Sequence, residues 1–263
     1  MNYVDWKLDG FLDHNCGSKC YDGHQGTNFT LKSFQQMDSG VDVLAAASDG
    51  VVTFIQDGLF DKETDGDITK RLGNYIAIKH ANLYYTYYGH LKKNSLKVAS
   101  GDTVKSGDII AQVGSSGNST DPHLHFELWY DSSFVVDPFI GPCGNNQTLW
   151  KSNISYDSSF GHFDYGVRLD SNLGINDLRY RDKSFSKPLV TYPSSDSNIY
   201  FWSHLYGLRK GDLMTLNWFT PDGSEWFEFG FTIDQDYWYY YYWSFIDHQN
   251  LASGKRQMAS ETK

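Results

Sequence analysis

The sequence contains few cysteines, and their number limits what disulfides can do. Cys16, Cys20 and Cys143 are three in 263 residues, too few for a disulfide scaffold. Three residues separate Cys16 from Cys20, whereas redox motifs and zinc knuckles have two. We expect one disulfide with one thiol left over, either Cys16–Cys20 or a bond from Cys143 back to one of them. Three free, partly buried thiols are the alternative.

Long apolar runs and an excess of basic charge are also absent. No stretch approaches the roughly 20 apolar residues that span a bilayer, and the start, MNYVDWKLDG, lacks the basic-then-apolar pattern of a signal peptide. We therefore expect no membrane span, and any export signal lies outside this sequence. The chain has 22 basic and 32 acidic side chains, a net charge of −10. Such a surface repels polyphosphates and anionic lipid, so we expect no nucleic-acid partner.

Aromatic residues and glycines are abundant and indicate a mostly β protein. Aromatics make up 17% of the chain, and 24 glycines help to separate short runs of strand length. Residues 1–145 are predicted to form antiparallel strands joined by tight turns. A change of character near residue 145 predicts a second, smaller β-sandwich-like domain over 150–250, followed by a flexible polar tail at 251–263.

Two histidines stand one residue apart in the stretch HLHFELWY. On a strand, side chains i and i+2 project from the same face, about 6.5 to 7 Å apart along the chain. His123 and His125 are therefore expected to point together into one cleft, with Leu124 and Phe126 turned to the core. A histidine pair alone is weak evidence, because buried histidines satisfied by the backbone are common.

Further histidines upstream complete a set that suits a catalytic metal. His24 and Asn28 lie in a glycine-rich segment that favours a turn leading into a strand, and His90 ends the run YYGH. A hydrolytic zinc ion takes three protein ligands and keeps a fourth position for water. His24, the side chain at 28 and one of the pair His123 and His125 supply three. The other two histidines are then available for proton transfer or oxyanion stabilisation.

These motifs carry a resemblance to a known family. DGHQGTNF, YYGHL and DPHLHFE, with VLAAASDGVV, GNYIAIKH and SGDIIAQVGSSGNS between them and VVDPF at the end, resemble the lysostaphin-type (LytM-like) zinc metallo-endopeptidases. The similarity covers about residues 9–142. It implies a β-rich domain with an active-site groove over an antiparallel sheet. It also implies cleavage of peptide bonds in bacterial cell-wall peptidoglycan or in glycine-rich proteins, and a secreted or periplasmic location.

The resemblance also implies roles for individual residues. The family's first and last metal-binding histidines match His24 and His125, and its catalytic histidines match His90 and His123. The implied cofactor is Zn²⁺, which activates water and polarises the scissile carbonyl. One catalytic histidine takes the proton of the water and the other steadies the oxyanion, with their assignment open. The bond cut and the oligomeric state are not fixed by the sequence.

The sequence departs from the family at the middle metal ligand. The family has an aspartate there, and this chain has Asn28. A carboxamide oxygen offers a dipole where a carboxylate offers a charge, so the bond to zinc is weaker. Three interpretations follow: an active neutral site, a chain inactivated by an Asp-to-Asn change, or a natural pseudo-enzyme. The last gives the alternative function, an inactive cell-wall-binding or regulatory module on a degenerate peptidase scaffold.

Some residues outside these motifs also carry expectations. Glu127 shares a strand face with His125, yet we favour a solvated carboxylate over a partner of that ring. The run from Asp236 to Trp243 holds seven aromatics, and one face of its strand should leave rings exposed. Docking onto the first domain is favoured slightly over a glycan-binding surface. Ordinary surface or core roles are expected for the remaining histidines, His14, His80, His162, His204 and His248.

Overall fold

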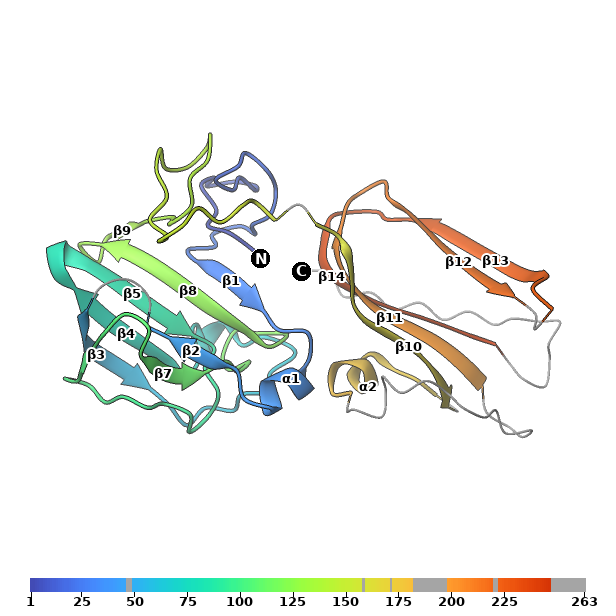
Figure 1. Ribbon diagram of the computed structural model, residues 1–263, viewed down its shortest axis with the longest axis horizontal. Helices are drawn as coiled ribbons and strands as arrows, with labels where there is room; N and C mark the ends of the chain where they lie inside the picture. The colour runs from blue at the N-terminus through green and yellow to red at the C-terminus, as the bar shows by residue number, and fades with distance from the viewer. Residues whose placement is uncertain (46–48, 158, 171, 182–197, 220–221, 247–263) are drawn as a thin grey trace. The chain divides into compact units, whose positions relative to one another are not determined.

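The computed structural model divides the chain into two compact units, Met1–Asp157 and Ser158–Lys263. It describes residues 1–45, 49–157, 159–170, 172–181, 198–219 and 222–246 (Figure 1). The tail at 251–263 and His248 lie outside these residues. Most of the regular structure is antiparallel strand, so the predicted mostly β fold is confirmed. The predicted roles of the two units, a peptidase domain and an accessory domain, stay predictions.

The first unit is built on an antiparallel sheet in the order β1-β8-β5-β4-β3-β6, with β9 pairing β8 and a separate β2–β7 pair (Figure 1). Its strands are β1 (Thr27–Thr30), β2 (Asp42–Leu44), β3 (Gly50–Gln56), β4 (Tyr75–His80), β5 (Tyr84–Gly89), β6 (Thr103–Val104), β7 (Ile109–Gln112), β8 (His123–Tyr130) and β9 (Phe134–Val135). Its helical elements are short: α1 (Phe34–Asp38) and the 3₁₀ turns Ile68–Lys70 and Ala81–Leu83.

Alternation along the strands supplies the core of this unit. Ile76 and Ile78 of β4 are fully buried, and on β8 the core residues Phe126 and Leu128 are joined by the partly buried Leu124. These positions share one face because strand side chains alternate. The expectation that Leu124 and Phe126 face the core is confirmed. The other face of β8 is left to the odd-numbered residues, which include both of its histidines.

A disulfide ties the two ends of the first unit together. Cys16 and Cys143, 127 residues apart in sequence, are bonded, and Cys20 is a buried free thiol. One disulfide with one thiol left over is therefore the observed state. A bond of this span stabilises a fold mainly by restricting the unfolded chain.

The second unit has three layers. Its strands and helix are β10 (Gly161–Asp170), α2 (Ile175–Arg179), β11 (Asn198–Leu208), β12 (Leu213–Phe219), β13 (Glu225–Thr232) and β14 (Tyr237–Ile246). The sheet β10-β11-β14 lies in the middle. Leu173, just before α2, and Leu178, within it, pack with Trp202 and Tyr241 on one face. The hairpin β12–β13 packs on the other through a second cluster.

The aromatic run on β14 is covered, so the predicted exposure of its rings is wrong. Tyr240 and Tyr242 belong to the cluster under the β12–β13 hairpin, while Tyr241 and Trp243 belong to the cluster with α2. All four are at most 5% exposed. The prediction assumed that a strand buries a single face, whereas this sheet is covered on both faces within its own unit.

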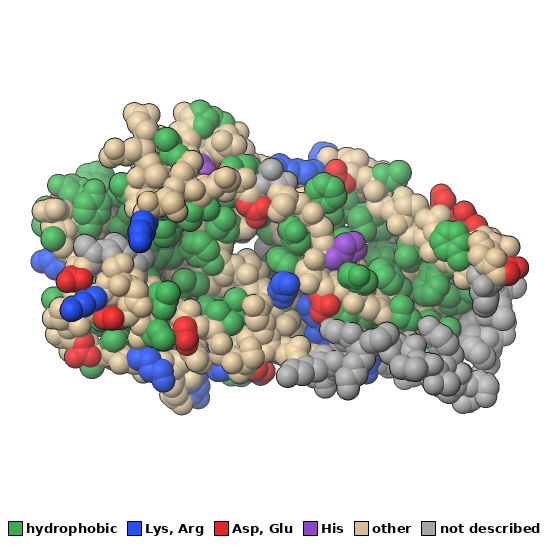
Figure 2. Space-filling view, viewed as in Figure 1, with side chains coloured by type: hydrophobic (Ala, Val, Ile, Leu, Met, Phe, Trp, Pro, Cys, Tyr) green, Lys and Arg blue, Asp and Glu red, His purple; other side chains and the backbone are tan. Residues whose placement is uncertain are grey.

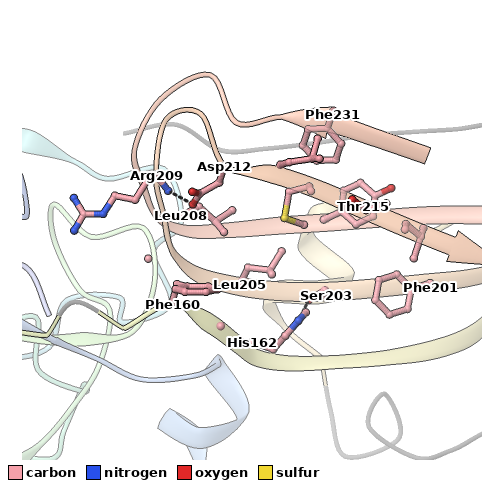
Figure 3. Close-up of a pocket in the computed structure, with 16 residues that line it drawn as sticks. Phe160, His162, Phe201, Ser203, Leu205, Leu208, Arg209, Asp212, Thr215 and Phe231 are labelled. Carbon is pink, nitrogen blue, oxygen red and sulfur yellow. Dashed lines mark hydrogen bonds between the residues drawn. The ribbon is translucent and has the colours of Figure 1, made fainter. Parts of the chain in front are cut away.

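A cavity of about 810 Å³ remains between β11 and the β12–β13 hairpin (Figure 3). Its lining is mainly apolar and includes Phe201, Leu205 and Met214. At its edge the His162 ring nitrogen Nδ1 lies 2.6 Å from the Ser203 hydroxyl oxygen. The hairpin thus covers this face of the sheet without filling all the space beneath it.

Charged side chains of both signs are interspersed over the face drawn in Figure 2. This mixture and the net charge of −10 give no support to a polyanionic partner. Within the described residues, the helices are all too short or too polar to cross a bilayer.

Candidate functional site

Pairing of β1 with β8 joins segments that are about a hundred residues apart in sequence. In this antiparallel register Asn28 is the direct partner of His125. His24 precedes β1, in a turn where Gly23 adopts a φ of +72°, a conformation that glycine takes without strain. Gly26 is required for space, because a Cβ there would lie 2.8 Å from His125 Nε2 and 2.6 Å from the Phe126 carbonyl oxygen. The turn and the strand register together aim three side chains at one point.

The three predicted metal ligands form a small triangle of polar atoms. His24 Nε2 lies 3.2 Å from Asn28 Oδ1 and 3.2 Å from His125 Nδ1. Asn28 Oδ1 lies 2.8 Å from His125 Nδ1. All three residues are buried, at 3%, 6% and 5% exposure. The structure therefore brings together His24, Asn28 and His125, as the motifs predict; their role as metal ligands stays a prediction.

Hydrogen bonds on the outer side of the triangle set the tautomers of both rings. His24 Nδ1 lies 2.6 Å from the Tyr3 carbonyl oxygen, which can only accept, so Nδ1 carries the hydrogen. His125 Nε2 lies 2.9 Å from Glu127 Oε1, so its hydrogen is on Nε2. In the neutral rings, His24 Nε2 and His125 Nδ1 then both present lone pairs to the triangle.

The interior of the triangle is thus rich in acceptors. Burial lowers the pKa of His24 well below its usual range, and the neighbouring His125 lowers it further, so this ring is neutral near pH 7. Its lone pair meets those of His125 Nδ1 and Asn28 Oδ1. With the His125 hydrogen on Nε2, three acceptor atoms meet at hydrogen-bonding distance, and such a set suits a cation. The third corner of this triangle is a carboxamide. Among the described residues, no group of three His, Cys, Asp or Glu side chains is arranged to hold a metal ion.

His90 and His123 lie beside the triangle. Their ring centroids are 4.6 Å apart, and the His90 ring is 5.6 Å from that of His125. His90 follows β5 with a φ of +57°, a left-handed conformation in which histidine is enriched among non-glycine residues. That conformation ends the strand at the point where the ring enters the site. All five predicted site residues are therefore gathered in one place.

Both of these rings are anchored through Nδ1. His90 Nδ1 donates to the Ser116 carbonyl oxygen at 2.7 Å, and His123 Nδ1 donates to the Asp121 carbonyl oxygen at 2.7 Å. Nε2 of each neutral ring is left as an acceptor. Burial lowers the pKa of His123 to about 4. Burial also lowers the pKa of His90 well below its usual range, and the neighbouring His123 lowers it further. Both are proton acceptors near pH 7.

Glu127 is a partner of the site, so the favoured interpretation of it as a solvated carboxylate is wrong. It is only 8% exposed; besides the bond to His125, its Oε2 accepts from Trp129 Nε1 at 2.6 Å. His125, Glu127 and Trp129 share one strand face by the period of two. That spacing was visible in the sequence, whereas the burial that keeps water from Glu127 depends on the folded unit.

Tyr21 and Tyr3 are site residues that the sequence reasoning missed. The Tyr21 ring stacks on His24 with centroids 4.1 Å apart, and its hydroxyl oxygen lies 3.4 Å from Asn28 Nδ2. Tyr3 contributes its backbone carbonyl, which no sequence pattern can reveal. Burial raises the pKa of Tyr21 to about 12, so its hydroxyl keeps its proton at neutral pH.

Comparison with known proteins bears on this site. Residues 23–138 match the model of Peptidase family M23. An uncharacterized metalloprotease of Buchnera aphidicola is 36% identical over 115 residues, 44% of this chain and 25% of that protein. Peptidoglycan DD-endopeptidase ShyC of Vibrio cholerae is 39% identical over 72 residues, 27% of this chain and 16% of that protein. The matched part of the chain thus spans a quarter or less of the length of these curated relatives.

Solved structures are also similar to this chain. The catalytic domain of lysostaphin from Staphylococcus simulans is 26% identical, covers 52% of this chain and 86% of that chain, and superposes with a TM-score of 0.35. The family resemblance carried by the motifs is confirmed by the family match, which includes every residue of the triangle together with His90 and His123. Residues 23–138 are a peptidase M23 (LytM-like) domain.

Proposed function

We propose that this protein is a zinc-dependent endopeptidase that hydrolyses peptide cross-links of bacterial cell-wall peptidoglycan. The observation that carries the proposal is the convergence of His24 Nε2, Asn28 Oδ1 and His125 Nδ1, within 3.2 Å of one another, in an M23 domain. Two of the similar proteins are named peptidoglycan DD-endopeptidases. The substrate class is extended to this chain from those names.

The donor set of the triangle fits zinc. Tetrahedral zinc with bonds of about 2.0–2.1 Å to nitrogen and oxygen places its ligand atoms about 3.3 Å apart. The three distances here are 2.8, 3.2 and 3.2 Å. His24 and His125 each direct a nitrogen lone pair inward and donate their other ring hydrogen outward, the arrangement that metal-binding histidines adopt. His24, Asn28 and His125 are the residues that would hold the ion.

The mechanism divides the work between the ion and two histidines. Zinc, when bound, supplies Lewis acidity and lowers the pKa of water. His90 and His123, neutral at pH 7, each offer Nε2 as a proton acceptor, and the ring that takes the proton of the attacking water becomes a cation. Because Nδ1 of each ring already donates to a backbone carbonyl, only this protonated ring has an Nε2–H for the oxyanion or the leaving amine. One ring therefore fills both roles that the resemblance divides between two.

Two properties follow from this arrangement of His90 and His123. Burial disfavours a positive charge on either ring, and the two ring centroids are only 4.6 Å apart. The pair therefore takes up one additional proton at a time. The buried site also strengthens the attraction between that single charge and an oxyanion. The pair therefore acts as one acid–base unit.

The location proposed for this protein is outside the cytoplasm. Its substrate class is a cell-wall polymer, and the Cys16–Cys143 disulfide persists in oxidising compartments. The partner is a peptidoglycan peptide or a glycine-rich peptide.

Metal analysis beside a cleavage assay tests the proposal. We expect the purified chain to bind about one equivalent of zinc and to cleave cross-linked muropeptides slowly. Asn28→Asp should bind zinc at least 10-fold more tightly. Replacing a group that only hydrogen-bonds a metal ligand typically lowers metal affinity 10- to 100-fold, and a change of charge on a ligand itself should have at least that effect. His125→Ala is the matched inactive control. If neither the parent chain nor Asn28→Asp binds zinc or cleaves the substrate, the proposal is overturned.

Asn28 also favours a second candidate function, a cell-wall-binding or regulatory module on a degenerate scaffold. Under that alternative, sedimentation with isolated cell walls should be unchanged when His90 and His123 are both replaced by alanine. A zinc-dependent cleavage rate that these two replacements abolish would rule the alternative out.

A further inference from the structure

Glu127 occupies an unusual position for a carboxylate. It is buried, and both of its oxygens accept short hydrogen bonds, Oε1 from His125 at 2.9 Å and Oε2 from Trp129 at 2.6 Å. A buried carboxylate is retained only where such donors compensate its desolvation. Both donors come from β8 itself, two residues to either side on the same face. The three side chains therefore form a row along one strand.

This row controls which nitrogen of His125 faces the triangle. A carboxylate accepts and cannot donate, so the ring hydrogen is held on Nε2 and the lone pair on Nδ1. A free imidazole exchanges between its two tautomers, and only one of them offers Nδ1 to a cation. Trp129 in turn holds Glu127, since its indole Nε1–H can only donate.

The row also brings negative charge to a triangle that has none of its own. None of the side chains of His24, Asn28 and His125 can carry a negative charge in this site, whereas a carboxylate at position 28 would. Glu127 places a carboxylate one hydrogen bond from a corner of the triangle, and such a bond raises the basicity of the histidine it holds. Its burial keeps this charge from being screened by solvent.

We propose that Glu127, held by Trp129, is a positioning residue that compensates for the neutral Asn28 by fixing the His125 tautomer and supplying charge through that ring. The proposal rests on the proposed zinc site. It implies that the dependence on Glu127 is greater with asparagine at position 28 than with aspartate, since aspartate would supply the missing charge directly.

Two substitutions separate the hydrogen bond from the charge. Glu127→Gln removes the charge and keeps one acceptor oxygen, for which His125 Nε2–H and Trp129 Nε1–H compete, whereas Glu127→Leu removes the charge and both acceptors. Each is made in the Asn28 chain and in the Asn28→Asp chain, and zinc affinity is measured by competition with a chromophoric chelator. We expect Glu127→Gln to weaken zinc binding about 10-fold and Glu127→Leu about 100-fold with Asn28, and both losses to be several-fold smaller with Asn28→Asp. Glu63→Gln, which alters an ion pair with Lys70 on the same unit, is the control and should change neither affinity.

A second readout needs no metal. Nitrogen-15 NMR of the histidine rings in chelator-treated protein should show His125 as the Nε2–H tautomer in the parent and as a mixture in Glu127→Leu, with Glu127→Gln between the two. Trp129→Phe should give a smaller change in the same direction. Thermal unfolding identifies a variant that fails to fold, and Glu127→Gln, which keeps the size and one acceptor oxygen, then carries the test.

The outcomes distinguish this inference from the proposed function. Zinc binding by the parent with the same affinity in every Glu127 variant would overturn the role of Glu127 and leave the function standing. Equal losses with asparagine and with aspartate at position 28 would overturn the compensation. Absence of zinc binding in both the parent and Asn28→Asp would overturn the proposed function and this inference with it.

Discussion

The two units both bury histidines, but they use them in opposite ways. In the first, the inward atoms of His24 and His125 lie beside Asn28 Oδ1, in the set that we propose holds a cation. In the second, His204 is buried to the same degree and lies against a donor, with its Nδ1 3.4 Å from Arg181 Nη2 and its ring stacked on Tyr241. That histidine completes a packed layer.

This difference shows what identifies a site. Burial alone does not separate His125, at 5% exposure, from His204, at 3%. The groups facing the ring do. His24 Nε2, Asn28 Oδ1 and His125 Nδ1 converge within 3.2 Å of one another, whereas His204 Nδ1 faces the guanidinium of Arg181, a positive charge that repels a cation. The two units can also be compared through their carboxylates and through the stability of each unit.

Replacing one histidine from each unit gives the largest contrast. His125→Ala should lower zinc affinity by more than roughly 100-fold and reduce muropeptide cleavage to background, because it removes a corner of the triangle. His204→Ala should leave zinc affinity unchanged and lower stability by about 2–3 kcal/mol through lost packing with Tyr241. Chelator competition and urea unfolding measure the two effects. An equal loss of zinc affinity in both variants would contradict the distinction.

The disulfide is expected to stabilise one unit selectively. Cys16 and Cys143 close a loop of 127 residues, for which the chain-entropy model gives about 4–5 kcal/mol. Replacing both by serine should speed amide hydrogen exchange in β4 of the first unit and leave β11 of the second unchanged. Cys20→Ser, which alters the free thiol, is the control. Equal acceleration in both strands would show that the units unfold together.

Acid should weaken the first unit through its neutral histidines. The pKa of His123 is lowered to about 4 in the folded protein, mainly by burial, while the unfolded value is about 6.5. As pH falls below about 6.5 the unfolded chain takes up a proton that the folded chain refuses, so stability falls until about pH 4.

For this one residue the loss between pH 7 and pH 5 is about 2 kcal/mol. His24 and His90 shift in the same direction and add to it. Urea unfolding with a chelator present measures the effect at both pH values. His123→Gln should reduce the difference between them; an undiminished difference would remove His123 as a source.

Much of this site could be predicted because its signals are local in sequence. The period of two placed His123 and His125 on one face, and the ordered motifs assigned His24 and His90. Glu127 was misinterpreted because the same period cannot say whether a polar residue faces water or a buried ring. Tyr3 was missed because it acts through a backbone carbonyl, which any residue possesses.

The aromatic run shows the limit for the fold. Its alternation predicts two faces correctly, but what covers each face is set by segments far along the chain. Leu178 of α2 and Phe231 of β13 cover opposite faces of β14. The sequence of the run does not encode either contact, so it predicted an exposed face where both faces are buried.

Two carboxylates, Asp137 and the partly buried Asp164, give the smallest and most discriminating comparison. Asp137 of the first unit is fully buried; its Oδ1 accepts from the Phe139 backbone N–H at 3.0 Å, and the Trp6 side chain also favours its charged form, but neither offsets its burial. His14 Nδ1 lies 3.8 Å from Asp137 Oδ2 and has no hydrogen-bond partner among the described residues. Burial raises the pKa of Asp137 to about 6, so its ionisation at neutral pH opposes folding. Asp164 of the second unit instead bonds Arg181 Nε at 2.9 Å.

Opposite signs are therefore expected for the same substitution in the two units. Asp137→Asn should raise stability at pH 8 by about 1–2 kcal/mol, since it removes a poorly compensated charge and provides a donor near His14 Nδ1. The gain should fade towards pH 4, where Asp137 is already protonated. Asp164→Asn should lower stability at pH 8 by about 1–3 kcal/mol, because it removes a carboxylate that bonds the buried Arg181 guanidinium. Urea unfolding at pH 8 and pH 4 measures both, and a destabilised Asp137→Asn would mean that the carboxylate is satisfied after all. Such a result would place Asp137 with the matched pairs of the second unit, and the contrast between the two units would then rest on the histidines alone.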